Sequence, residues 1–384
     1  MCPKQNRTDL GTYLRVLICR ATPIAPDPRV EKIARALVGG GYEVCTLGWD
    51  MQGDIPLAEQ LDGYQRIRLR VKARFGHGLR NITHQLRWQC ALLSWLFKHR
   101  QTYDIIHACD FDTVLPAWIS KRLWHKKVVY DIFDFYADML RATPRRAVEW
   151  IRRLDLKVID RVDAVILADD SRREQIAGSH PHRCEVIYNS PADTPSNREN
   201  SYRPEESLLH LVYVGNLQLE RGLLIMLEVL ARHPEWTLSL AGFGGEEQQI
   251  CDLAKELPNI TWYGRVPYQQ ALQLSAAADV LFATYDPAIL NHRYSSPNKV
   301  FEAMMLGKPI VVARDTHMDR MIENAACGLV VEYGNPAALE AALSQLQTDI
   351  ELRQRLGVNA RRAYETQYDW SLMQARLLKL YREL

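Results

Sequence analysis

Short apolar runs alternate with helically spaced apolar positions along the first half of the chain. Arg29–Gly39 shows the helical pattern, with Val30, Ile33 and Leu37 on one face. The apolar runs predict buried strands at Leu14–Cys19, Glu43–Gly48, Tyr103–Ala108, Lys127–Tyr130, Ala164–Ala168 and Cys184–Tyr188. This strand–helix–strand succession predicts a parallel sheet with helices on both faces.

The pattern restarts after a polar stretch. Residues 189–206, NSPADTPSNRENSYRPEE, contain three prolines and no apolar run, which is typical of a linker. Further strands are then predicted at Leu209–Val214, Thr237–Ala241, Ile260–Tyr263, Val280–Ala283 and Ile310–Val312. We therefore predict two Rossmann-like domains, residues 1–190 and 208–365, joined by a linker at 191–207. Residues 366–384 contain an amphipathic helix long enough to cross back to the first domain.

Such sheets bind ligands at the carboxyl ends of their strands, so we expect a site in a cleft that the two sheets face. The length of 384 residues fits two domains, and the net charge of +2 is too small to indicate a nucleic-acid partner. Eight scattered cysteines without a C-x-x-C pair indicate reduced thiols. With no secretory signal and no apolar run near the roughly 18 residues of a membrane span, we expect a cytoplasmic protein.

The charge is unevenly distributed. Between Gly63 and Tyr103 there is no acidic residue, whereas nine basic residues fall there: Arg66, Arg68, Arg70, Lys72, Arg74, Arg80, Arg87, Lys98 and Arg100. A helical stripe runs through the same block, formed by Leu79, Ile82, Leu86, Cys90, Leu93 and Phe97, and a second apolar face by Trp88, Leu92 and Trp95. Either this helix is buried against the sheet, or residues 63–103 contact an anionic membrane surface, such as the inner face of the cell membrane.

Two strands of the second half end in glycine turns. VYVGNLQLERG places Gly215 at a strand end and Arg221 at the following helix start, where a diphosphate can bind. LSLAGFGGEE places Gly242 and Gly244 after the next strand, but Glu247 stands where a dinucleotide fingerprint needs its third glycine. Read alone, the first turn is equally consistent with an ordinary strand–helix connection, and the second is a weak signal.

The stretch YSSPNKVFEAMMLGKPIVV, residues 294–312, predicts a helix capped by Ser296 and ended by Gly307. Its free N–H groups and Lys299 suit an anion, and Glu302 suits the vicinal diol of a ribose. The alternative is a capped core helix with Glu302 in solvent. Together with the glycine turns, the helix start indicates a site for a nucleotide diphosphate.

These stretches resemble the C-terminal half of glycosyltransferase family 4, of GT-B fold, as do ITWYGRVPYQQALQLSAAADVLFATYDP and SPNKVFEAMMLGKPIVVA. DPRVEKIARALVGGGYEV and YDIIHACDFDTVLPAWISKRLWHKKVVYDIFDFYADM resemble its N-terminal half. The resemblance covers nearly the whole chain. It implies transfer of a sugar from a nucleotide-diphosphate donor, with no metal or other cofactor.

The resemblance also implies roles for single residues of the second domain. Arg221 matches a diphosphate-binding cation, Asn216 replaces an arginine of many members, and Glu302 matches the ribose-binding acid of a paired-acid motif. The remaining matches lie near the base, the diphosphate or the sugar: Gly242, Gly244, Ser296, Asn298 and Lys299.

Three positions depart from the family pattern. Tyr294 replaces the first acid of the pair, ATPIAPDPRV replaces an N-terminal Gly-Gly loop, and Phe133 replaces a histidine. Asp131 and Asp134 remain at that strand end, and we predict that Asp134 is the catalytic base or orients the acceptor. In a front-face retaining mechanism the departing phosphate can take the acceptor's proton, but these departures leave the stereochemistry open.

His107 and Asp110 lie in an HAxD pattern that makes them further acceptor-side candidates, although a strand-end histidine is more often structural. Asp110 and Asp112 form a D-x-D triplet, the metal motif of the other large glycosyltransferase fold, which we consider a chance match. The sequence thus predicts a membrane-associated glycosyltransferase whose second domain binds a UDP- or GDP-sugar and whose first binds a lipid-linked or polysaccharide acceptor. The alternatives are an epimerase of the same fold and an inactive binding partner.

Overall fold

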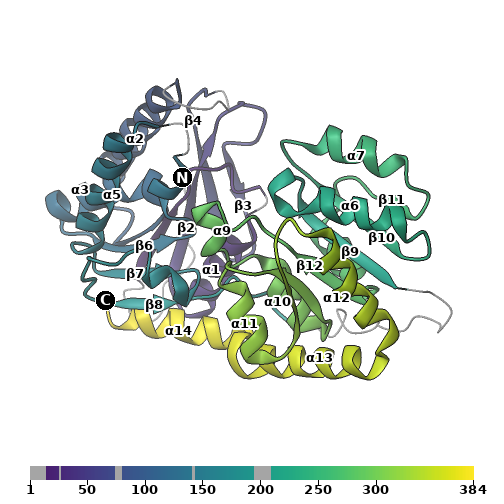
Figure 1. Ribbon diagram of the computed structural model, residues 1–384. Coiled ribbons are helices and arrows are strands. Elements are labelled where there is room, and N and C mark those ends of the chain that lie inside the picture. Colours follow the sequence, from purple (N-terminus) through teal and green to yellow (C-terminus); the bar gives the residue numbers. More distant parts are fainter. Residues whose placement is uncertain (1–13, 26, 74–79, 141–142, 194–208) are drawn as a thin grey trace. The chain divides into compact units, whose positions relative to one another are not determined.

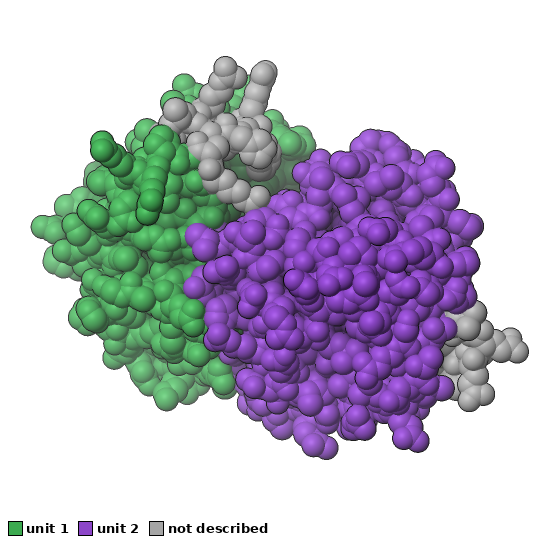
Figure 2. All heavy atoms as spheres, viewed as in Figure 1, with its two compact units in different colours: residues 1–187, 374–384 green, residues 188–373 purple. Residues whose placement is uncertain are grey.

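The computed structural model describes residues 14–25, 27–73, 80–140, 143–193 and 209–384. The chain forms two compact units (Figure 2). Unit 1 runs to Ile187 and also includes Gln374–Leu384, and unit 2 is Tyr188–Met373. The predicted boundary after residue 190 thus falls at 187, and most of the predicted linker 191–207 lies outside the described residues.

Unit 1 contains one sheet of eight strands in the order β3-β4-β2-β1-β5-β6-β7-β8 (Figure 1). Its strands are β1 (Arg15–Cys19), β2 (Glu43–Asp50), β3 (Ala58–Gln60), β4 (Tyr64–Arg70), β5 (Ile105–Cys109), β6 (Lys127–Ile132), β7 (Ala164–Leu167) and β8 (Cys184–Val186). All pairings are parallel except that of β3 with β4.

The helices of unit 1 cover both faces of this sheet. They are α1 (Pro28–Gly39), α2 (Arg80–Lys98), α3 (Phe111–Trp124), α4 (Tyr136–Met139) and α5 (Arg145–Ile159), with a 3-10 turn η1 (Asp170–Arg173). Helices α2, α3 and α5 each lead one way along the sheet and α1 the other, so right-handed crossovers place α1 on the opposite face. Pro28 starts α1, and the Asp27 side chain caps it by accepting from the Val30 N–H.

Unit 2 contains a second, all-parallel sheet in the order β11-β10-β9-β12-β13-β14. Its strands are β9 (His210–Asn216), β10 (Thr237–Phe243), β11 (Ile260–Trp262), β12 (Val280–Ala283), β13 (Ile310–Ala313) and β14 (Gly328–Val331). Leu211 and Tyr213 of β9 pack into one apolar cluster and Val212 into another, so both faces of the sheet are buried.

The helical elements of unit 2 are η3 (Leu219–Arg221), α6 (Leu223–Arg232), α7 (Glu247–Lys255), α8 (Tyr268–Ala276), α9 (Leu290–Arg293), α10 (Asn298–Leu306), α11 (Met318–Ala325), α12 (Pro336–Thr348), α13 (Ile350–Ala363) and η4 (Tyr364–Tyr368). Helix α14 (Trp370–Arg382) starts in unit 2, and its last turns belong to unit 1. The predicted fold class, two parallel-sheet α/β domains of the GT-B kind, is confirmed.

The basic block 63–103 is not one basic surface. Arg66 and Arg68 of β4 are 6% and 3% exposed, and they pair with Glu31 at 2.8 Å and Glu59 at 2.7 Å. Arg70 pairs with Asp50 at 3.1 Å. The side chains of Arg74, Leu79, Arg80 and Ile82 lie outside the described part of the chain. Arg66 and Arg68 are therefore not available to a membrane, whereas Arg87 and Lys98 of α2 are exposed.

Helix length and hydropathy also bear on the membrane. Over the described ranges, no helix combines the length and the apolar character needed to cross a bilayer.

Candidate active site

The carboxyl ends of β9 and β10 lie in direct contact through two glycines. Gly215 pairs in register with Gly242, and both have positive φ angles, of 155° and 144°. A Cβ atom on Gly242 would lie 1.8 Å from the Gly215 carbonyl oxygen, and one on Gly215 would lie 3.2 Å from the Lys299 Nζ. Both positions therefore require glycine, and this places the Lys299 amine beside the strand end.

Two cations lie against two tyrosine rings at this end of the sheet. The Lys299 Nζ is 3.3 Å from the ring centroid of Tyr213, and the guanidinium carbon of Arg221 is 3.9 Å from that of Tyr285. Burial lowers the pKa of Lys299 well below its usual value, and the nearby charge of Arg221 lowers this pKa further. A negatively charged group of a ligand at this position would be stabilised by both cations.

Three buried polar atoms of this region have no hydrogen-bond partner among the described residues: the Lys299 Nζ, the Arg221 Nε and the Ser296 Oγ. A buried donor without a partner costs about 1–3 kcal/mol, so such groups are rare unless a ligand uses them. Their chemistry, two cations and one hydroxyl, fits the oxygens of a diphosphate.

Helix α10 begins one residue later than a Ser296 cap requires. Its N-cap is Pro297, without a capping side chain, and its first residue is Asn298. The prediction that Ser296 caps the helix is therefore wrong, which leaves this hydroxyl available to a ligand. The predicted stop at Gly307 is confirmed, since Gly307 is the C-cap with a φ of 65°.

Glu302 lies one turn into α10, on the same side of the helix as Lys299. Its exposure is 9%, so the alternative in which it faces solvent is wrong. Burial and the Glu302 carboxylate together raise the pKa of the Tyr268 hydroxyl on α8. A buried carboxylate beside Lys299 matches the polarity of a nucleoside diphosphate, with the diol next to the diphosphate.

The other predicted donor-side residues lie around this group. Tyr294, at the end of α9, stacks on His317 with ring centroids 5.0 Å apart. Asn216 is exposed, and its carbonyl accepts a 2.7 Å bond from the Tyr213 hydroxyl. Gly244 lies against the Leu217 backbone, where a Cβ would approach the carbonyl oxygen to 2.3 Å.

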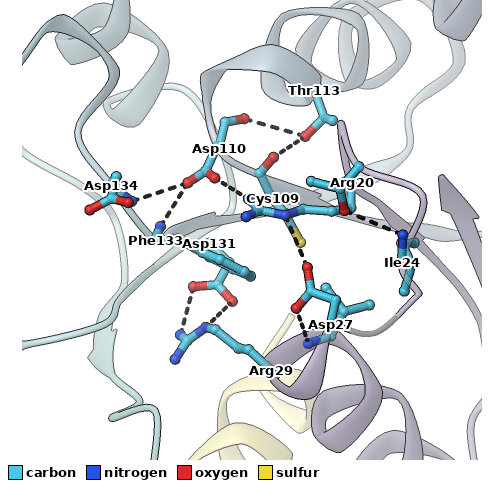
Figure 3. A network of polar contacts seen from close by, with 12 residues as sticks. Arg20, Ile24, Asp27, Arg29, Cys109, Asp110, Thr113, Asp131, Phe133 and Asp134 are labelled. Carbon is cyan, nitrogen blue, oxygen red and sulfur yellow. Dashed lines mark hydrogen bonds and ion pairs between the residues drawn. The ribbon is translucent and has the colours of Figure 1, made fainter. Parts of the chain in front are cut away.

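The carboxyl ends of β1, β5 and β6 in unit 1 are joined by a polar network (Figure 3). Arg20 follows β1 and pairs with both Asp27 and Asp110. Asp110 also accepts hydrogen bonds from the backbone N–H groups of Phe133, at 2.8 Å, and Asp134, at 3.3 Å. Asp110 thus fixes the loop that carries Asp134.

A second, fully buried part of this network contains His107. The His107 Nδ1 lies 2.7 Å from the Tyr381 hydroxyl of α14, and its Nε2 lies 3.3 Å from Asp131. Asp131 also pairs with Arg29 at 2.8 Å, and this charge overcomes the effect of burial and lowers the pKa of Asp131. His107 is 0% exposed, so these contacts favour the structural role over the acceptor-side one.

Asp134 is the most accessible of the three predicted catalytic residues. Its side chain is 49% exposed, compared with 16% for Asp110. The guanidinium of Arg172, which is itself buried, donates to one Asp134 oxygen at 3.0 Å. The ring of the preceding Phe133 faces the Arg20 guanidinium, with 4.1 Å between the ring centroid and the guanidinium carbon.

The D-x-D triplet does not form a joint carboxylate pair. Asp110 binds Arg20, whereas burial and the charge of Asp110 raise the pKa of Asp112 to about 7. In the part of the chain that the structure describes, no group of three His, Cys, Asp or Glu side chains could hold a metal ion.

Sequence reasoning missed three residues of these sites. Tyr213 and Tyr285 face the two cations, and Arg172 holds Asp134. Tyr285 lies two positions after the end of the predicted strand Val280–Ala283. This place at a strand end could have indicated that Tyr285 belongs to the site. Arg172 lies 38 positions from Asp134, and only the fold brings them together.

Two α/β units, one with a buried basic group beside a glycine-lined strand edge, define the class of GT-B proteins that bind nucleotide sugars. The family model for group 1 glycosyl transferases matches residues 195–363, and the model for the glycosyl transferase 4-like domain matches residues 25–190. The chain belongs to glycosyltransferase family 4, and it is a glycosyltransferase that uses a nucleotide-sugar donor.

Among curated relatives, D-inositol 3-phosphate glycosyltransferase of Corynebacterium jeikeium is 24% identical over 323 residues, covering 77% of this chain and 75% of the relative. Glycogen synthase of Mycobacterium tuberculosis is 23% identical over 290 residues, covering 72% and 68%.

Solved structures show the same fold. Sucrose-phosphate synthase from Thermosynechococcus elongatus matches with a TM-score of 0.80 and 16% identity, covering 96% of this chain and 98% of that one. Anabaena HepE in complex with UDP and glucose matches with a TM-score of 0.71 and 16% identity, covering 97% and 100%.

Proposed function

We propose that this glycosyltransferase moves a sugar from a UDP- or GDP-sugar to a lipid-linked or polysaccharide precursor, with retention and without a metal ion. Unit 2 binds the donor and unit 1 the acceptor. The observation that carries the proposal is the group of buried donors without partners, on Lys299, Arg221 and Ser296, beside the buried Glu302. The UDP-sugar complexes of Anabaena HepE, which has the same fold, support the choice of nucleotide.

In this proposal each donor-side residue recognises one part of the nucleotide sugar. Arg221 and Lys299 bind the diphosphate and neutralise the charge that develops on it, a task that a metal ion performs in other transferases. Glu302 accepts hydrogen bonds from the ribose hydroxyls. Ser296 and the first N–H groups of α10, from Asn298 onward, bind a phosphate or the sugar.

The reaction breaks the bond between the sugar's anomeric carbon and the phosphate oxygen and forms one between that carbon and the acceptor oxygen. The acceptor hydroxyl loses its proton, and Asp134 orients this hydroxyl. Arg172 donates to one Asp134 oxygen at 3.0 Å and so fixes the carboxylate that accepts the hydrogen bond of this hydroxyl. The departing phosphate, on the same face of the sugar, takes the proton, and this route retains the configuration.

The nucleotide site is tested by thermal shift with a panel of UDP- and GDP-sugars. At a ligand concentration of 100 times Kd, binding stabilises the folded protein by about 2.7 kcal/mol. Arg221→Ala and Glu302→Ala should abolish the shift without lowering the melting temperature of the free protein. Glu228→Ala and Arg320→Ala, exposed positions of the same unit, are the matched controls. Undiminished binding by both site variants would refute the proposal.

The reaction is tested by NMR of the donor sugar with and without extracted acceptor glycans or lipids. Transfer that depends on the acceptor, with the anomeric configuration kept, is the expected outcome. Conversion of the donor to a second nucleotide sugar without acceptor would identify an epimerase instead. Tyr294 and Phe133, which replace an acid and a histidine, motivate the alternative of an inactive partner, and any transfer above background contradicts it.

A further inference from the structure

Helix α2 has two apolar faces, and only one of them is buried. Trp88, Leu92 and Leu96 are 0% exposed, and the Trp88 indole stacks on Trp49 with ring centroids 5.0 Å apart. Leu86 and Phe97 lie on the other side and are 57% and 51% exposed. One apolar face is sufficient to pack a helix on its domain, so the second face needs another explanation.

The exposed face is a continuous stripe. Leu86, Cys90, Leu93 and Phe97 follow one another at intervals of four, three and four positions, which places them in one line along a helix. Cys90 is exposed and Leu93 is half-buried. The stripe thus runs for three turns along the side of α2 that faces away from the core.

The stripe belongs to a larger helical layer. Helices α2 and α3 pack on each other, as do α3 and α5, and all three cover the same face of the unit 1 sheet. The Phe97 ring lies 5.6 Å from that of Trp124 on α3. Leu123 of α3 is 61% exposed and Trp150 of α5 is 65% exposed. The layer therefore presents large apolar side chains to solvent from each of its helices.

The same layer concentrates positive charge. Helices α2, α3 and α5 together contain ten Lys or Arg and three Asp or Glu, a formal charge of +7 in a chain whose net charge is +2. Two of the acids, the half-buried Asp112 and the buried Asp155, have pKa values raised to about 7, mainly by the loss of solvent around them. The third, Glu149, pairs with Arg153 at 2.9 Å.

We propose that the outer surface of α2, α3 and α5 docks unit 1 on an anionic lipid bilayer. Leu86, Phe97, Leu123 and Trp150 enter the interfacial region, and Arg87, Lys98 and their basic neighbours contact the head groups. A second copy of the chain would not suit this surface. A symmetric dimer would bring two positively charged layers together, and their repulsion would disfavour it. The inference goes beyond the proposed function and does not depend on it, because docking needs neither donor nor acceptor.

The test is co-sedimentation of the full chain with vesicles of phosphatidylcholine alone or mixed with phosphatidylglycerol, without nucleotide. The native chain should bind the mixed vesicles and not the neutral ones. Leu86→Ser with Phe97→Ser should weaken binding by about tenfold or more, because both side chains lose their apolar contact. Arg87→Gln with Lys98→Gln should weaken it by about twentyfold, since each basic residue near the surface contributes about fivefold.

The matched control is Leu253→Ser with Val358→Ser, exposed apolar positions of unit 2 at 45% and 60%. It should bind as the native chain does. Leu86→Ser with Phe97→Ser could lower the melting temperature of the protein. In that case Arg87→Gln with Lys98→Gln still tests the proposal, because the side chains of Arg87 and Lys98 are exposed. Binding to neutral vesicles, or equal binding by all variants, would overturn the proposal. So would a dimer that Leu86→Ser with Phe97→Ser dissociates while no vesicles bind.

Discussion

Lys299 lies on the first turn of α10 with its amine against the ring of Tyr213 and without a hydrogen-bond partner among the described residues. Such a cation is costly to bury, and its pKa falls because burial and Arg221 disfavour its charged form. The position becomes favourable when a diphosphate arrives, since two negative groups then share the space with Lys299 and Arg221. Lys299 therefore lowers the stability of the free protein and stabilises its complex with a diphosphate.

Lys299→Met separates these two effects. Methionine keeps the length of the side chain and removes the charge, so the free protein should gain about 1–3 kcal/mol, the usual cost of a buried group without a partner. Binding of UDP or GDP should weaken by at least about tenfold, which corresponds to 1.4 kcal/mol. Urea unfolding and calorimetric titration measure the two quantities. Lys255→Met, at a 62% exposed side chain, is the control and should change neither.

Calorimetry in buffers of different ionisation enthalpy gives a further readout for Lys299. Its pKa is low in the free protein and rises when a diphosphate binds, so complex formation should take up a proton. The affinity for the diphosphate should then fall as the pH rises from the pKa of Lys299 in the free protein towards its higher pKa in the complex. Binding by the native chain without proton uptake would contradict the charge assignment of Lys299.

Asp155 gives the opposite kind of test, of stability. It is 0% exposed on α5, accepts a 2.9 Å bond from the Tyr130 hydroxyl, and burial raises its pKa to about 7. Between the unfolded value of about 3.9 and about 7, only the folded chain holds this proton. The free energy of unfolding should therefore fall as the pH rises from about 4 to about 7. Above pH 7 this group should cause no further change.

Asp155→Asn should remove this slope and stabilise the protein by about 4 kcal/mol at pH 8, with little effect near pH 4. Asp112, whose pKa is also raised to about 7, leaves a second slope of the same sign in the variant. Urea unfolding at several pH values measures both. Asp170→Asn, at a 65% exposed side chain, is the control, and a pH profile unchanged by Asp155→Asn would contradict the assignment.

The predictability of single elements depended on how they are buried. Strand β9 is apolar on both faces and was predicted to within two residues of its bounds. Strand β4, YQRIRLR, was missed because its alternating arginines resemble a solvent-facing pattern. Their partners, Glu31 and Glu59, come from α1 and β3, so the burial of these charges depends on tertiary contacts that the local sequence does not contain.

Helix α2 shows the same limit from the other side. Its sequence contains two apolar stripes, and periodicity alone could not decide which of them packs on the sheet. The structure buries the Trp88 stripe because that indole stacks on Trp49 and donates to the Asp112 carbonyl oxygen. The Leu86 stripe remains outside, which turns an open alternative of the sequence into the docking surface proposed above.

The candidate sites were predictable to a similar degree. Glycine turns, Arg221, Lys299 and Glu302 could be read from local sequence, because their chemistry follows from a strand end and a helix start. The Ser296 cap was wrong, since Pro297 takes the N-cap position. Arg172, which holds Asp134, could not be found, because the two residues come from different strand ends of unit 1.

At the scale of the whole molecule, the chain leaves unit 1 at Ile187 and re-enters it at Gln374. The returning segment fills a real part of the unit 1 core, because Leu377, Leu380 and Tyr381 are 0%, 5% and 1% exposed. Tyr381 also bonds the His107 Nδ1 of β5 at 2.7 Å. Unit 1 therefore depends on residues that follow the whole of unit 2 in the sequence.

Deletion of Gln374–Leu384 should consequently affect the two units unequally. Loss of three buried side chains, at about 1.5–3 kcal/mol each, approaches the 5–15 kcal/mol that stabilises a typical domain. Hydrogen exchange should show much faster exchange of the β1 and β5 amides in unit 1 and little change in β9 and β10 of unit 2. Because Arg221, Lys299 and Glu302 all belong to unit 2, the truncated chain should still bind UDP or GDP while losing transfer activity. Equal loss of protection in both units would contradict this independence, and lost nucleotide binding with β9 still protected would show that the donor site needs unit 1.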